Sequence, residues 1–99
     1  MKRIGLAMLW IGTSHGAVTT GADLEQAERN YQQLCQQCHG VNRIGGAGPA
    51  LLPQSLGRIK PSEIRQVIEN GRPASQMAAF GALLEPAQID ALALYLQRP

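Results

Sequence analysis

Three side chains that can bind a metal or react covalently lie within one five-residue segment. Cys35, Cys38 and His39 spell C-x-x-C-H, with two glutamines between the cysteines. This spacing is the attachment signal for haem c. Residues three apart on a helix project from one face, so both thiols can reach the two vinyl groups of one porphyrin. His39 follows one helical turn after Cys35, where its imidazole can take one axial position on the iron.

Other uses of the cysteine pair fit the sequence less well. A thioredoxin-like redox pair needs a βαβ pattern beside C-x-x-C, and the sequence shows no strand pattern. A tetrahedral zinc site needs four ligands, and the chain after residue 22 holds no further His or Cys. A disulfide between adjacent helical turns would close only a tiny loop, and catalytic cysteine chemistry lacks a separate base. The prediction is therefore one covalently attached haem c.

Met77 is the candidate for the second axial ligand. It is the only methionine after residue 22, and it lies in an expected loop between two helices, 38 residues after His39. Such a loop can pass over the ring edge and approach the opposite face of the haem. The alternative is that Met77 fills a gap in the core, as methionine often does.

The first 22 residues are predicted to be a secretory signal peptide. Lys2 and Arg3 give a positive start, and residues 4–12 form an apolar run that is too short to span a bilayer. Cleavage could follow Gly16 or Ala22. A buried first helix and a retained anchor remain alternatives. The working domain is then residues 23–99.

The elements that must position the site are expected to be helices. An apolar stripe predicts a helix from Asp23, as its N-cap, to near Gly40. A glycine- and proline-rich loop covers residues 40–58, and a second helix covers residues 61–70. After a loop over residues 71–84, a last helix starts near Glu85 and Pro86. The expected fold class is all-α, with three to four helices wrapped around the haem.

The charge of the chain excludes one class of function, and its size indicates that a cofactor helps to stabilise the fold. Without Lys2 and Arg3, the nine basic residues fall to seven and balance the seven acidic ones, which excludes a polybasic nucleic-acid binder. A core of about 80 residues supplies few kcal/mol unaided, so the haem must contribute apolar surface. The side chains expected to line the haem are Leu51, Leu52, Leu56, Ile59, Ile64, Val67, Ile68, Phe80, Leu83 and Leu84.

Residues 23–98 resemble small bacterial class I cytochromes c. The resemblance is carried by Gly40 after the haem motif, the turn over residues 48–51, Gly71, Met77 with Phe80 three residues on, and the C-terminal residues 93–96. It implies that the carbonyl of Pro49 accepts a hydrogen bond from Nδ1 of the axial histidine. The chain is also similar to the small cytochromes c encoded with dissimilatory nitrite reductase of denitrifying bacteria. It departs from many relatives in having Ala78, and not proline, after the methionine.

The resemblance implies a periplasmic, monomeric one-electron carrier with no enzymatic activity of its own, serving a redox partner such as nitrite reductase or the maturation of its haem cofactor. An alternative is a gas-binding sensor in which Met77 is displaced, and another is a subunit that relays electrons inside a larger complex. Four arginines in or beside the loops are expected to make the haem-edge side positive relative to the acidic terminal helices and to steer an acidic partner. They are Arg43, Arg58, Arg65 and Arg72.

Overall fold

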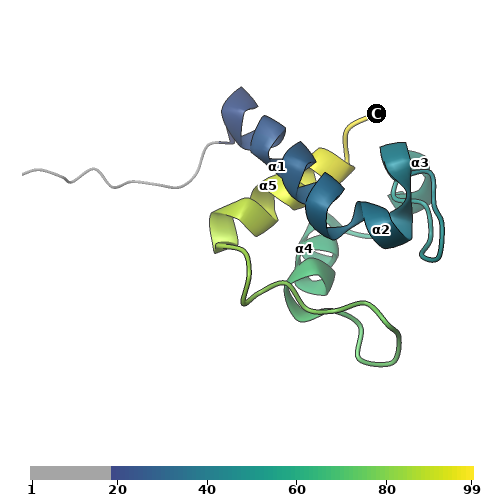
Figure 1. Ribbon diagram of the computed structural model, residues 1–99. Coiled ribbons are helices and arrows are strands. Elements are labelled where there is room, and N and C mark those ends of the chain that lie inside the picture. The colour runs from purple at the N-terminus through teal and green to yellow at the C-terminus, as the bar shows by residue number, and fades with distance from the viewer. Residues whose placement is uncertain (1–18) are drawn as a thin grey trace, which may run out of the picture.

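The computed structural model describes residues 19–99, and in this range it contains helices and no strand (Figure 1). The predicted signal peptide falls mainly outside the described residues. The expected all-α fold is confirmed. The helices are α1 (Gly21–Leu34), α2 (Gln36–His39), α3 (Pro53–Leu56), α4 (Pro61–Asn70) and α5 (Pro86–Leu96), with a 3-10 turn at Val41–Arg43.

The start of α1 differs from the sequence expectation. Thr20, and not Asp23, is the N-cap: its hydroxyl accepts from the Asp23 backbone N–H at 3.1 Å. The Asp23 carboxylate in turn accepts from the Thr20 backbone N–H at 2.9 Å. Each side chain thus satisfies a donor that the first helical turn leaves open. The predicted single helix is also broken at Cys35, where α1 ends and the short α2 begins.

The boundaries of α4 and the start of α5 agree with the prediction. Each helix has proline as its first residue, where the missing N–H costs no hydrogen bond. Glu63 accepts from the Lys60 backbone N–H at 3.0 Å, and Gln88 accepts from the Glu85 backbone N–H at 2.8 Å. Gly71 ends α4 with φ of +70°, a value that side chains rarely adopt. The loop expected between the two helices is present.

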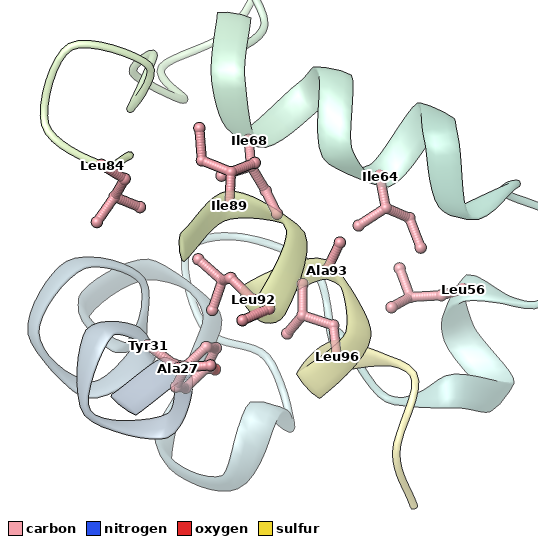
Figure 2. Close-up of a cluster of buried hydrophobic side chains, with 11 residues drawn as sticks. Ala27, Tyr31, Leu56, Ile64, Ile68, Leu84, Ile89, Leu92, Ala93 and Leu96 are labelled. Atoms are coloured by element: carbon pink, nitrogen blue, oxygen red, sulfur yellow. The ribbon is translucent and has the colours of Figure 1, made fainter. Parts of the chain in front are cut away.

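The core lies where α5 packs against both α1 and α4 (Figure 1). Ala27 and Tyr31 on α1 face Leu92 on α5, and all three are at most 1 % exposed. Burial of each large apolar side chain contributes about 1.5–3 kcal/mol. This cluster therefore fixes the crossing of α1 and α5, beside which the cysteine motif begins. Figure 2 shows the cluster: Ala27, Tyr31, Leu56, Ile64, Ile68, Leu84, Ile89, Ala91, Leu92, Ala93 and Leu96.

Arg43 is a buried cation that caps the C-terminal end of α5. Its side chain donates to the carbonyls of Leu96 at 3.2 Å and Arg98 at 2.9 Å, with longer bonds to the two neighbouring carbonyls. Its guanidinium carbon also lies 4.9 Å from the centre of the Tyr95 ring. Helix ends carry unpaired carbonyls and partial negative charge, so a cation is favourable there.

Within residues 19–99, the helices are too short and too polar for any of them to cross a bilayer.

Candidate functional site

The cysteine motif bridges the end of α1 and the whole of α2. Cys35 is the residue at which α1 ends, and its carbonyl accepts from the backbone N–H groups of Cys38 at 3.1 Å and His39 at 2.9 Å. These bonds wind the motif into one turn. Both thiols are free, Cys35 half-buried and Cys38 exposed. The turn presents two sulfurs and one imidazole on the same short segment.

The Cys35 thiol is protonated at neutral pH. Burial, with a smaller contribution from the neighbouring Cys38, raises its pKa to about 11. A low-dielectric surrounding disfavours the thiolate. Cys35 therefore lacks the lowered pKa of a nucleophilic or redox-active cysteine.

The loop after α2 orients the His39 ring. The Nδ1 atom of His39 lies 2.8 Å from the carbonyl oxygen of Pro49, the pairing that the family resemblance implies. The N–H at Nδ1 donates to this carbonyl, so the ring presents Nε2 as the free nitrogen. Gly48 makes room for the ring, because a Cβ there would lie 2.9 Å from Cε1 of His39. Any side chain at position 48 would collide with the imidazole.

Backbone hydrogen bonds fold this loop tightly onto the motif. Gly48 N–H donates to the Cys38 carbonyl at 2.6 Å, and Gly45 N–H donates to the His39 carbonyl at 2.7 Å. At the other side, the hydroxyl of Tyr31 donates to the Gly40 carbonyl at 2.6 Å. The buried α1 residue thereby fixes the start of the loop that holds Pro49 against the histidine.

A cavity of about 730 Å³ brings the predicted site residues together. Cys35, Cys38, His39, Pro49 and Met77 all line it, although Met77 is 38 residues from His39. The volume lies within the usual range of ligand and cofactor sites. The cavity is mostly apolar, and its two thiols, one imidazole with a fixed ring and one thioether are groups that could hold a haem c. The residues that line the cavity therefore fit a haem c.

Seven of the ten expected apolar residues line the cavity, and three do not. Leu83 is 68 % exposed, Leu84 belongs to the helical core, and Leu52 precedes α3 without reaching the cavity. These three lie beside α3 or in the chain that enters α5, and neither segment brings them to the cavity. Leu34, Leu92 and Leu96 also line the cavity, although none of them was predicted as a lining residue.

Met77 is half-buried, and hydrogen bonds hold both polar groups of its backbone. Its N–H donates to the Ser75 hydroxyl at 3.2 Å, and its carbonyl accepts from the Arg72 N–H at 3.1 Å. Gly71 is pressed against this segment, since a Cβ there would lie 2.7 Å from the Met77 carbonyl oxygen. The loop that carries Met77 is thus closed on itself directly after α4.

Four arginines were expected to form a positive surface near the haem edge, and for two of them, Arg43 and Arg65, this expectation is wrong. Arg43 is buried and binds backbone carbonyls, so it presents no charge to a partner. Arg65 forms ion pairs with Glu69 and Asp90, both at 2.6 Å, which offset its charge. Arg58 and Arg72 are exposed, and only Arg72 lines the cavity. The loop segments 44–57 and 73–84 carry no charged residue at all.

The helical fold and this donor set define a c-type cytochrome domain. The chain belongs to the cytochrome c family: the family model described as "Cytochrome C oxidase, cbb3-type, subunit III" matches residues 22–96. A cytochrome c domain implies haem c, and Cys35 and Cys38 are compatible with covalent attachment.

Three relatives illustrate the match. The chain is 49% identical over 96 residues to "Dihydro-heme d1 dehydrogenase" of Pseudomonas aeruginosa, covering 97% of this chain and 19% of that protein. A solved structure, "Dihydro-heme d1 dehydrogenase NirN in complex with DHE", is 54% identical with a TM-score of 0.71, covering 73% of this chain and 16% of that one. The structure "c-type cytochrome NirC" is 28% identical with a TM-score of 0.71, covering 79% of this chain and 92% of that one. The chain thus spans about a fifth of the dehydrogenase and nearly all of the small cytochrome.

Proposed function

We propose that this protein is a one-electron carrier that holds a single haem c through thioether bonds to Cys35 and Cys38, with His39 and Met77 as axial ligands. The observation that carries the proposal is the cavity lined by all four side chains, three from the motif turn and one from the loop that carries Met77. The match to a small cytochrome over nearly its full length supports a carrier rather than an enzyme domain.

The chain's own residues account for the properties that a carrier needs. When bound, haem c supplies the reversible exchange of one electron between its ferrous and ferric states. Pro49 keeps the His39 ring in one tautomer and one orientation, and makes Nε2 a stronger ligand. The apolar lining excludes water and disfavours the extra charge of the ferric state. With both His39 and Met77 holding the haem iron, no coordination position would be left for a substrate.

The protein is proposed to act in the periplasm after removal of its leader. Haem c attachment and the homology to Nir-type cytochromes support this compartment. Of the two predicted cleavage points, the one after Gly16 preserves the capping pair of Thr20 and Asp23. Cleavage after Ala22 would remove the Thr20 cap and the first two residues of α1.

The proposed partner is a haem protein of the nitrite reductase system, met by this chain as a monomer. Similarity to the NirN and NirC proteins supports this system. The loop segments 44–57 and 73–84 include the cavity-lining residues Pro49 and Met77 and are free of charged residues, which favours apolar contact over strong steering.

Absorption spectroscopy and a redox titration of the exported protein test the proposed ligation. Wild-type ferric protein should show the far-red sulfur-to-iron band and a clearly positive midpoint potential, since methionine ligation raises the potential relative to two imidazoles. The variant Met77→Ala should lose the band, and its ferrous form should bind carbon monoxide. A strongly negative midpoint would contradict His39 and Met77 as the ligand pair. Absence of the far-red band with ready carbon monoxide binding by the wild type would contradict the carrier and favour the gas sensor.

A further inference from the structure

Ser75 lies two residues before Met77 and forms hydrogen bonds in both directions. Its hydroxyl donates to the Arg72 carbonyl at 3.1 Å and is positioned to accept from the Met77 N–H at 3.2 Å. Its backbone N–H donates to the same Arg72 carbonyl at 2.9 Å. One side chain therefore links Arg72, near the start of the loop, to the backbone of the methionine.

The remaining restraints on Met77 come from the loop backbone. The Arg72 N–H holds the Met77 carbonyl at 3.1 Å, and Gly71 leaves the space that this close approach requires. Ala78 follows the methionine, so the fixed φ that proline would impose at that position is absent. Without the Ser75 hydroxyl, the Met77 N–H would lose its partner within the loop, and the loop would gain freedom to move the thioether.

We infer that Ser75 is a positioning residue that holds the Met77 thioether on the haem iron and so keeps external ligands away from it. The inference rests on the proposed function, because it takes Met77 to be an axial ligand. An external ligand such as imidazole must displace the methionine, so its apparent affinity falls in proportion to how firmly the loop holds Met77. Loss of one neutral hydrogen bond changes such an equilibrium about fivefold.

Imidazole titration of the ferric holoprotein, followed by visible absorption, tests this role. Ser75→Ala should bind imidazole about fivefold more tightly than wild type, with loss of the far-red band at lower imidazole concentration. Ser75→Thr keeps the hydroxyl and should stay close to wild type. Ser62→Ala is the matched control, because Ser62 is also exposed but lies in the first turn of α4.

The outcomes separate the two claims. If wild type has no far-red band, the proposed ligation fails. If wild type has the band but Ser75→Ala has unchanged imidazole affinity, the positioning role of Ser75 is overturned. An equal change in Ser62→Ala, or no rescue in Ser75→Thr, would also overturn it, because the effect would then not come from the hydroxyl.

Discussion

At the scale of single residues, the site depends on Tyr31, although Tyr31 does not line the cavity. Its ring is 1 % exposed and its hydroxyl fixes the Gly40 carbonyl at the start of the loop that carries Pro49. Burial raises the pKa of the Tyr31 hydroxyl above its ordinary value of 10.0, with smaller contributions from Cys35 and Tyr95. The folded protein therefore binds this proton more tightly than the unfolded chain.

This shift predicts a loss of stability in alkaline solution. The contribution of Tyr31 is fully present below pH 10 and is lost as the pH rises through the higher pKa of the folded state. Guanidinium unfolding of the reduced holoprotein should show a falling free energy of unfolding above pH 10. Tyr31→Phe should be about 1 kcal/mol less stable at pH 7 because it loses the bond to Gly40, and its alkaline decline should be shallower. An identical alkaline decline in both proteins would contradict the assignment.

The cysteine motif was predictable at this scale because its spacing alone specifies the chemistry. The N-cap of α1 was assigned wrongly, although its signal was present in the sequence. Thr20 and Asp23 form the pattern of a capping box. Because the predicted domain begins at residue 23, Thr20 was not considered as an N-cap.

At the scale of elements, Arg43 joins the loop over the histidine to the end of α5. Its backbone carbonyl accepts from the Leu51 N–H at 2.9 Å, two residues after Pro49, while its side chain caps the helix. Both Asn42 and Arg43 have positive φ values, of 59° and 65°, a conformation that costs a non-glycine residue energy. The bonds of the guanidinium offset that cost.

Replacement of Arg43 by methionine keeps the apolar stem and removes the charged cap. We expect Arg43→Met to lower the free energy of unfolding by about 2–4 kcal/mol, since several charge-assisted hydrogen bonds are lost. Arg29→Met is the control, because Arg29 is exposed on α1 and bonds only to Gln26 among the described residues; it should change stability by less than about 0.5 kcal/mol. Equal stability of the two variants in urea unfolding would show that Arg43 is not a structural cap.

The sequence was sufficient to predict the bounds of α4, but it was not sufficient to predict the role of Arg43. Proline at the start and glycine at the end delimit α4, so its bounds could be predicted. The partners of Arg43 are backbone carbonyls 52 to 56 residues away, which carry no mark in the sequence. An arginine among glycines in a loop was therefore interpreted as a surface charge, and the fold shows it to be interior.

At the scale of the whole molecule, the fold is a small helical core beside a large cavity. Core residues of α4 and α5, among them Ile68 and Leu92, line the cavity together with half-buried loop side chains such as Leu51 and Phe80. A chain of this size gains little from such a core alone, and the proposed haem would complete it. The sequence predicted this division through its two long loops, but not which leucines face the cavity, because that depends on how α3 and the chain entering α5 turn.

Covalent attachment of the haem is the claim on which the rest depends, and intact mass of the exported protein under denaturing conditions tests it most directly. The expected mass is that of the processed polypeptide plus one haem, and the Soret band should survive acid–acetone extraction. In Cys35→Ala, Cys38→Ala, the attached mass and the native helical circular dichroism should both be lost. A wild-type protein with the mass of bare polypeptide and no Soret band would show that no haem is covalently attached.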